Sequence, residues 1–377
     1  MRGNIRLGSL LGIPILVNPS WFILFGLVTW LLAVDVYPSA LEDRGRTTHI
    51  IMAAVSALAF FACIVLHELA HSIVAKLYSI PVRSITLFLI GGVAQITREA
   101  RKPAAELYMA AAGPLTSLVL GAAFLGVWWA LGSGDTPVDY VLVWLSLMNV
   151  VLGVFNFLPA FPMDGGRVFR SLIWMVSGNY NRSTSIAGWT GRGIAWAMMG
   201  LGFLGVLGVD AYLVSDAFGG LWIILIGLFL ENAARQSLFQ NKVFQKLGQY
   251  TAKDLMLENP PTIDISATIG NLSSALGLNP RLCWFVERDG RLAGLLSLHE
   301  MRKVPQERWA DTTAAEAMIP STNLKPTTLD ATASDILLEM ENSELTHLPV
   351  VEDGRVIGVV GRDRIVGVLS RSGLLPA

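Results

Sequence analysis

Charged residues are scarce in this chain, and they are unevenly distributed. They account for 15% of the 377 residues, whereas an ordinary soluble domain has roughly 25%. The net charge of −1 indicates no nucleic-acid partner, because nucleic-acid-binding proteins carry a strongly basic surface. Cysteine is also rare: Cys63 and Cys283 lie far apart, and the first falls inside an apolar run. A disulfide framework is therefore not expected.

Six windows before residue 235 lack Asp, Glu, Lys and Arg, and most approach the roughly 20 apolar residues that cross a bilayer as a helix. They are residues 7–34, 47–67, 107–134, 140–163, 193–209 and 217–230, the last needing Asn232 and its neighbours to reach across. Basic residues outside the windows fall almost entirely on one side of a six-span arrangement. That side is predicted to be cytoplasmic. We therefore expect a multi-pass protein of the cell membrane with both termini in the cytoplasm.

From Thr251 onward the composition is that of a soluble α/β domain, and this part contains an internal repeat. The hexapeptide TAKDLM at 251–256 is echoed by TAAEAM at 313–318, and DGRLAG at 289–294 by DGRVIG at 353–358. Each Asp-Gly pair separates two short apolar runs, which predicts a hairpin followed by a helix. A polar connection at 241–248 is predicted to join this part to the membrane part. The predicted domains are a membrane domain at 1–240 and two repeats at 250–308 and 312–371.

Two of the five histidines stand in His67-Glu68-Leu69-Ala70-His71, at the end of the second apolar window. Residues four apart share one face of a helix, so both imidazoles can bind one metal ion. Glu68 lies one step round the helix, where it can accept a proton from metal-bound water. Ionisable side chains inside a membrane helix are costly and usually functional. Metal chemistry is therefore favoured over a chance match in a packed helix.

A catalytic zinc site usually has three protein ligands, so the histidine pair requires a third. The fourth window runs into NFLPAFPMDGG at residues 156–166, where two prolines and two glycines must unwind the helix. Unwinding would turn Asp164 toward a neighbouring helix, and the charge distribution puts it on the same cytoplasmic side as His67 and His71. Asp164 is the expected third ligand. The alternative is an interfacial aspartate at a helix end.

Residues 85–97, ITLFLIGGVAQIT, contain two β-prone runs on either side of Gly91-Gly92. A glycine pair can adopt the positive φ angles of a tight hairpin turn. Extended backbone at membrane depth is tolerated only where protein or a watery cavity covers it. We therefore expect a hairpin turning at Gly91 and Gly92, near the cytoplasmic face and beside the metal. An ordinary short loop is the alternative.

Together these motifs resemble the site-2 protease family of intramembrane zinc metalloproteases, and in particular its six-span members with a C-terminal pair of cystathionine-β-synthase (CBS) domains. The resemblance covers nearly the whole chain. It implies a polytopic α-helical membrane protein that holds one zinc ion through His67, His71 and Asp164, with Glu68 as general base and acid. It also implies that Asn156 donates a hydrogen bond to the developing oxyanion.

The expected reaction is hydrolysis of a peptide bond within or near the transmembrane segment of a membrane-anchored regulatory protein. A helical substrate must unwind first, and the strands beside Gly91 and Gly92 could hold it as an added strand. Many family members have Asn where this chain has Ser117, a departure that we expect to affect helix packing only. The alternative function is a CBS-regulated metal-ion transporter or channel. Such a path needs polar groups through the full bilayer depth, whereas here they cluster at one level.

The C-terminal repeat resembles a tandem CBS pair over about residues 251–369. Such pairs often bind adenosine nucleotides, frequently through a Ser or Thr followed three residues later by Asp. Ser297 and Glu300 stand at these places in the first copy, and Gly361 and Arg364 in the second. Nucleotide binding at Ser297 and Glu300 is one interpretation. A structural module that dimerises the chain into a homodimer is the other.

Overall fold

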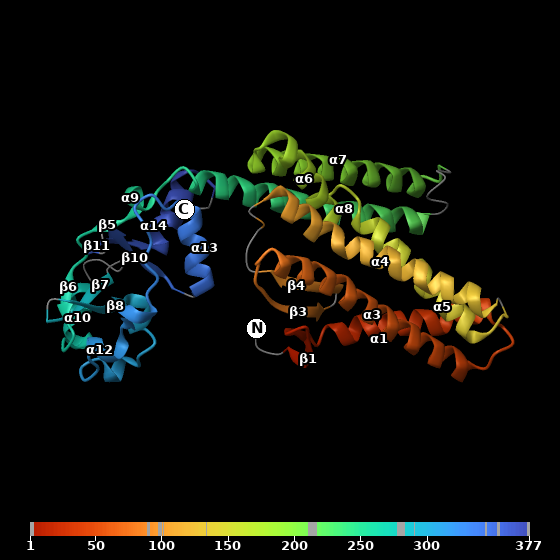
Figure 1. Cartoon of the computed structure of the whole chain (residues 1–377), viewed down its shortest axis with the longest axis horizontal. Helices are drawn as coiled ribbons and strands as arrows, with labels where there is room; N and C mark the ends of the chain where they lie inside the picture. Colours follow the sequence, from red (N-terminus) through yellow and green to blue (C-terminus); the bar gives the residue numbers. More distant parts are fainter. Residues whose placement is uncertain are drawn as a thin grey trace. The chain divides into compact units, whose positions relative to one another are not determined.

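The protein divides into two compact units, Met1–Phe239 and Gln240–Ala377. The structure is a computed structural model (Figure 1). It describes residues 4–88, 91–96, 100, 102–132, 134–209, 217–276, 283–289, 291–343, 345–352 and 355–374. Each unit has its own elements and core, so each is described by itself.

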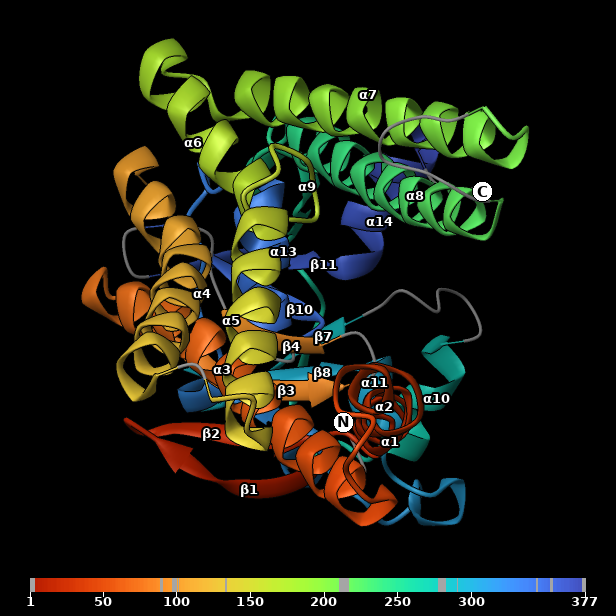
Figure 2. The ribbon, with the colours of Figure 1, turned by 90° about the vertical axis from the view of Figure 1, so that its right-hand side faces the viewer.

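The first unit opens with strands, which corrects the expectation that residues 7–34 form one membrane helix. β1 (Ile5–Leu10) and β2 (Ile13–Val17) form a hairpin, and helix starts only at Trp21. β2 alternates buried and partly buried residues, the period-2 pattern of a strand with one covered face. The window at residues 7–34 lacks charged residues, but glycine and proline interrupt it. The length of an apolar run does not by itself distinguish a strand from a helix. In Figure 2, β1 and β2 lie on the opposite side of this unit from α6 and α7.

Five helical segments in the described part of the chain are long and apolar enough to cross a membrane. They are α1 with its π-helical continuation and α2 (Trp21–Ala40), α3 (Arg46–Leu77), α4 (Pro103–Leu131), α5 (Pro137–Asn156) and α8 (Ala217–Leu247). The predicted polar connection at 241–248 is largely helical, because α8 continues through it to Leu247. The helices therefore supply the multi-pass membrane architecture that the apolar windows predicted.

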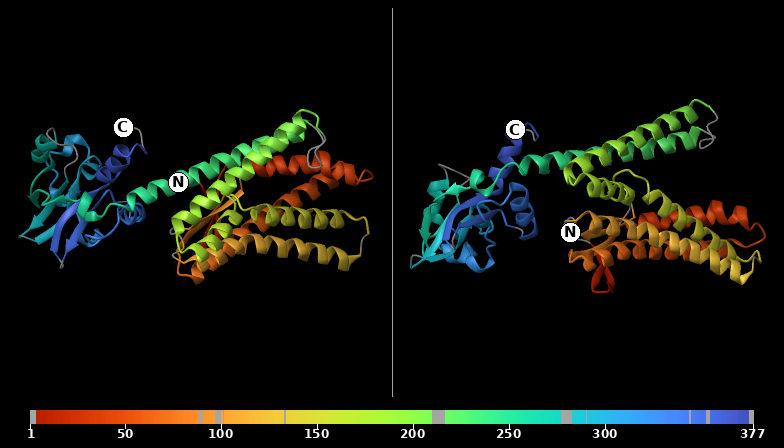
Figure 3. Two further views of the ribbon diagram at one scale, coloured as in Figure 1. Left: turned by 90° about the horizontal axis from the view of Figure 1, so that it is seen from above. Right: turned by 45° about the horizontal axis from the view of Figure 1, so that its top comes forward.

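Two further helices follow α5: α6 (Asp164–Ser177) and α7 (Tyr180–Val206). α7 contains the predicted fifth span and is 27 residues long, but it is not among the five most apolar helices. Its many glycines lower its hydropathy and allow close packing. A Cβ atom at Gly202 would lie 2.5 Å from the Gly220 carbonyl oxygen of α8. α7 and α8 run side by side in both views of Figure 3.

The predicted hairpin near the His motif is present, but its turn is not Gly91-Gly92. β3 (Val82–Phe88) pairs antiparallel with β4 (Gly91–Ile96), and Phe88 lies opposite Gly91. The two glycines therefore begin the second strand, and residues 89–90, which connect the strands, lie outside the described residues. β2 and β3 pair in parallel, so the sheet order is β1-β2-β3-β4.

The second unit contains the two repeats, each with the predicted hairpin. The hairpin strands are β7 (Cys283–Arg288) with β8 (Arg291–Ser297) and β10 (His347–Glu352) with β11 (Arg355–Gly361). Helices α11 (Leu298–Met301) and α14 (Arg362–Arg371) follow them. Gly290 and the Asp353-Gly354 pair of the predicted turns lie outside the described residues.

The two repeats are interleaved, because the opening segment of each contributes to the other's sheet. β5 (Leu257–Glu258) pairs with β11, and β9 (Ile319–Pro320) pairs with β8. β6 (Thr262–Asp264) completes the first sheet beside β7. The remaining elements are α9 (Ala252–Leu255), α10 (Ile269–Leu276), α12 (Ala314–Ala317), α13 (Ala333–Ser343) and two short 3₁₀ turns (Gln306–Arg308, Ser321–Asn323).

Candidate metal centre

His67 and His71 lie one turn apart on α3, with their rings on the same face. The 32 residues of α3 contain no glycine or proline, so nothing in the helix interior interrupts its hydrogen bonds. Both side chains are buried, with residue exposures of 4% and 6%. Their Nε2 atoms are 3.2 Å apart. The helix period therefore brings the two imidazoles together, as the spacing predicted.

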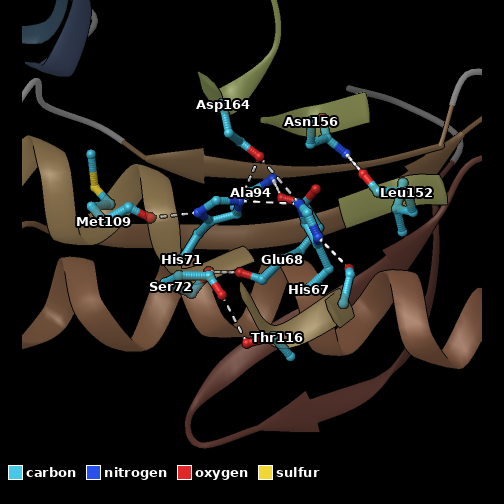
Figure 4. A network of polar contacts seen from close by, with 12 residues as sticks. His67, Glu68, His71, Ser72, Ala94, Met109, Thr116, Leu152, Asn156 and Asp164 are labelled. Carbon is cyan, nitrogen blue, oxygen red and sulfur yellow. Dashed lines mark hydrogen bonds and ion pairs between the residues drawn. The ribbon is translucent and has the colours of Figure 1, made fainter. Parts of the chain in front are cut away.

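Asp164 reaches the same point from a distant part of the chain, as expected. α5 ends at Asn156, residues 157–163 form turns, and Asp164 is the first residue of α6. Its Oδ2 atom is 3.3 Å from Nε2 of His67 and 3.1 Å from Nε2 of His71 (Figure 4). The three residues form a group whose ligand atoms all lie within 4.8 Å of one another.

The two glycines after Asp164 explain how the turn segment and α6 pack so closely. A Cβ atom at Gly165 would lie 2.3 Å from the carbonyl carbon and oxygen of Phe157. One at Gly166 would lie 2.8 Å from the carbonyl carbon of Ala160. In both cases the neighbour is backbone, which cannot rotate away. Only glycine therefore lets the start of α6 lie against the segment that precedes it.

The donor set suits a divalent cation. Ligands bound tetrahedrally to zinc at about 2.0–2.2 Å lie roughly 3.3–3.6 Å apart, and the three observed separations are 3.1–3.3 Å. Nδ1 of His71 is 2.6 Å from the Met109 carbonyl oxygen, which can only accept. Nδ1 of neutral His71 therefore carries the proton, and its Nε2 directs a lone pair at His67 and Asp164. A cation between these atoms converts facing lone pairs into coordination bonds.

Helix α4 contacts the Nδ1 atom of both imidazole rings and so orients them, a role that the sequence did not reveal. Oγ of Ser117 is 2.8 Å from Nδ1 of His67, and the Met109 carbonyl holds His71. Hydrogen bonds of this kind fix the tautomer and direction of metal-binding histidines. The expectation that the Ser117 departure affects helix packing only is therefore wrong, because its hydroxyl contacts a candidate ligand. In the sequence, the sign of this role was the departure at position 117, where many family members have Asn.

Gly113, in the same stretch of α4, is a second residue that sequence reasoning missed. A Cβ atom at this position would lie 2.1 Å from Nε2 of His71 and 2.6 Å from Nε2 of His67. Any side chain would therefore occupy the space over the two ring nitrogens. The glycine leaves that space clear.

Glu68 lies beside the histidines and contacts the sheet. Its Oε2 atom accepts a hydrogen bond of 3.0 Å from the Ala94 N–H of β4. A Cβ atom at Gly92 would lie 3.0 Å from Cγ of Glu68, so the glycine allows β4 to approach α3 closely. The hairpin is thus next to the carboxylate, as its position in the sequence predicted. Gly91 has φ of +126°, a conformation that favours glycine.

Asn156, the last residue of α5, directs its side-chain amide back into its own helix. Nδ2 donates to the Leu152 carbonyl oxygen at 3.0 Å. This bond uses one of the two N–H groups of the amide. Figure 4 shows the residue near Asp164 at the edge of the group.

Ser297 and Glu300 belong to the second unit: Ser297 is the last residue of β8, and Glu300 lies in α11. Ser297 is fully buried, and within the described residues its Oγ atom has no hydrogen-bond partner. The carboxylate of Glu300 is 2.6 Å from Nζ of Lys303.

A His-Glu-x-x-His helix meeting an aspartate within a bundle of apolar helices defines the membrane metalloprotease class. Comparison with known proteins agrees. The profile of peptidase family M50 matches residues 55–141 and 132–200, and that of the CBS domain matches residues 314–375.

Two relatives match this chain over nearly its whole length. A Synechocystis protein named "Putative zinc metalloprotease" is 33% identical over 99% of this chain and 97% of its own length. A protein of Methanocaldococcus jannaschii named "Zinc metalloprotease" is 30% identical over 98% of this chain and 97% of its own length. The solved site-2 protease of the same organism is 32% identical, with a TM-score of 0.40, covering 62% of this chain and 95% of that one.

The chain belongs to peptidase family M50, the site-2 proteases. It is a multi-pass membrane metalloprotease with a C-terminal CBS region. This assignment favours the protease over the transporter or channel as the function.

Proposed function

We propose that His67, His71 and Asp164 hold one zinc ion and that the protein hydrolyses a peptide bond in a membrane-anchored regulatory protein. The convergence of the three ligand atoms at 3.1–3.3 Å is the observation that carries the proposal. When bound, zinc supplies Lewis acidity, which activates water near neutral pH and polarises the scissile carbonyl. The names of the relatives support zinc as the metal.

Glu68 serves as general base and then as general acid. It takes the proton of the attacking water and passes it to the leaving amine. The hydrogen bond from the Ala94 N–H limits the rotation of the carboxylate, which keeps it beside the histidines. Asn156 donates its second N–H to the oxyanion that forms on the scissile carbonyl.

Gly91 and Gly92 hold the substrate by letting it join the sheet as an extra strand. β4 ends the strand order β1-β2-β3-β4 among the described residues. Ala94 directs its N–H to Glu68 rather than to its β3 partner Ile85. Backbone groups that point away from the partner strand recur every second residue, so the N–H of Gly92 points to the same edge as that of Ala94. An extended substrate paired there would run directly past the base.

The substrate is a protein with a transmembrane segment, and the site opens to the cytoplasm. The basic loops support this orientation, with both chain termini cytoplasmic. Water and an unwound substrate can then meet at the cytoplasmic end of α3. The substrate class follows from the family, in which membrane-anchored regulators are cut.

In the CBS region we propose that an adenosine nucleotide contacts Ser297 and Glu300. The unpartnered buried hydroxyl of Ser297 supports a ligand at this place, since buried polar atoms usually have a partner. Titration of the purified full chain with AMP and ATP by calorimetry tests this proposal, with Ser297→Ala as comparison. Heat that is the same in both proteins, or absent, excludes this nucleotide site. Light scattering of the same samples tests the homodimer.

The decisive experiment compares Glu68→Gln and Asp164→Ala in the full chain, purified in detergent. Glu68→Gln keeps the three ligands, so this variant should retain about one zinc per chain. It should not cleave a membrane-embedded reporter substrate. Asp164→Ala removes a ligand and should lose the zinc. Glu42→Gln, an exposed acid in the loop before α3, serves as the control. Wild-type cleavage by Glu68→Gln would exclude Glu68 as the base.

A further inference from the structure

Arg170 is a buried cation of α6 that forms an ion pair with a buried carboxylate of α4. Arg170 and Glu106 are 6% and 1% exposed. Nε of Arg170 donates to Oε1 of Glu106 at 3.0 Å, and Nη2 contacts the same oxygen. Nε of Arg167, which is more exposed, lies 3.7 Å from that oxygen. The pair joins the second turn of α6 to the first turn of α4.

The Arg170 guanidinium also lies over two aromatic rings. Its central carbon is 5.4 Å from the ring centre of Phe161 and 4.7 Å from that of Tyr180. Phe161 belongs to the turn segment that leads into Asp164, and Tyr180 is the first residue of α7. This one side chain of α6 therefore contacts the segment before Asp164, helix α4 and the start of α7.

The buried charges restrict the position in which α6 can pack against α4. A buried charge without its partner is strongly disfavoured, so α6 can dock on α4 only where Arg170 reaches Glu106. A planar guanidinium can stack on rings and donate in its own plane at the same time, which an ammonium cannot. Small displacements of α6 therefore break several contacts at once.

We propose that Arg170 and Glu106 are positioning residues that set the third ligand against the first two. α4 already orients His71 through the Met109 carbonyl, one turn after Glu106. The same helix thus holds the histidines directly and Asp164 through Arg170 and α6. The inference rests on the proposed zinc site, because its effect is on the geometry of that site.

The chain offers a matched control in Arg192 of α7. Its Nε and Nη2 are 3.1 and 3.0 Å from Oε1 of Glu231 in α8, and its guanidinium lies 4.6 and 4.9 Å from the ring centres of Trp189 and Trp196. This arginine has the same kind of ion pair and the same stacking. Neither α7 nor α8 carries any of the three candidate ligands.

The experiment compares Arg170→Lys and Arg192→Lys in the purified full chain. Zinc release to a chromophoric chelator and thermal unfolding are measured in parallel. Both variants should lose thermal stability, since in both the arginine's two-donor contact with one carboxylate oxygen and its ring stacking are lost. Only Arg170→Lys should release zinc faster, by about 10- to 100-fold, the usual effect of removing a group that supports a metal ligand. Glu106→Gln should behave like Arg170→Lys and replaces it if that variant does not fold.

Equal zinc release from Arg170→Lys and the wild type would overturn the inference while leaving the proposed function intact. Equal acceleration in both lysine variants would also overturn it, since the effect would then be loss of general stability. A wild-type protein that binds no zinc would remove the proposed function and this inference together. Faster release confined to Arg170→Lys and Glu106→Gln supports the positioning role.

Discussion

Replacing Gly113 by alanine should remove the metal without weakening the helix that carries it. The added Cβ atom would lie 2.1 Å from Nε2 of His71, whereas ordinary contacts begin at 3.4 Å, so the ring must move by about 1.3 Å. The ligand atoms are only 3.1–3.3 Å apart, so such a shift breaks the set. Misplacement by about 1 Å can reduce a rate about 100-fold, and we expect at least that loss of cleavage.

Helix propensity favours the alanine variant, so a loss of zinc or of cleavage cannot be attributed to a weaker α4. Alanine is favoured over glycine by about 1 kcal/mol inside a helix, so α4 itself is not weakened. A Cβ atom at Gly126 of the same helix would meet nothing within 4 Å, so Gly126→Ala is the control. Zinc content by mass spectrometry and cleavage of a reporter substrate are measured for both variants. A Gly113→Ala protein that keeps its zinc and cleaves at the wild-type rate would refute the geometry.

Three further predictions concern contacts away from the ligand atoms. Ser117→Ala removes the hydroxyl beside Nδ1 of His67 and should weaken zinc binding about 10- to 100-fold; chelator competition measures this, and Ser117→Asn should restore it. Gly165→Ala would place Cβ 2.3 Å from the Phe157 backbone and should prevent the docking of α6; loss of zinc with faster proteolysis at residues 157–163 is expected, and protection equal to the wild type would contradict it. Burial lowers the pKa of His347 below 6.5. The unfolded chain then binds more protons as pH falls through 6.5, so the second unit should lose stability from there downward. Hydrogen exchange of β10 and β11 at pH 7.5 and 5.5 tests this, and His347→Gln should flatten the difference.

The convergence of the three candidate ligands was predictable, because short sequence patterns specify both the helix period and the end of a helix. The spacing of His67 and His71 places them on one helix face. The prolines and glycines around Asp164 mark the end of a helix, and the charge pattern put that end on the histidines' side. None of these inferences required knowing which helices touch.

The residues missed by sequence reasoning depend on contacts between helices. Ser117 and Gly113 look like ordinary small residues of an apolar helix, and only the packing of α4 on α3 gives them partners. In the sequence, Arg170 is one of the basic residues outside the apolar windows, and its burial depends on Glu106, 64 residues earlier. The N-terminal window was misassigned for a similar reason: β1 and β2 are strands because β3 lies beside β2.

Helix α4 contacts the site at several positions along one of its faces. Within three turns it presents Glu106 to α6, the Met109 carbonyl to His71, Gly113 to both ring nitrogens and Ser117 to His67. These contacts recur at intervals of three or four residues, which is the period of one helix face. A rotation of α4 would disturb all of these contacts together. The positions of the candidate ligands on α3 and on α6 therefore both depend on α4. Substitutions on this face should therefore act jointly on zinc binding, whereas those on the lipid-facing side, such as Gly126, should not.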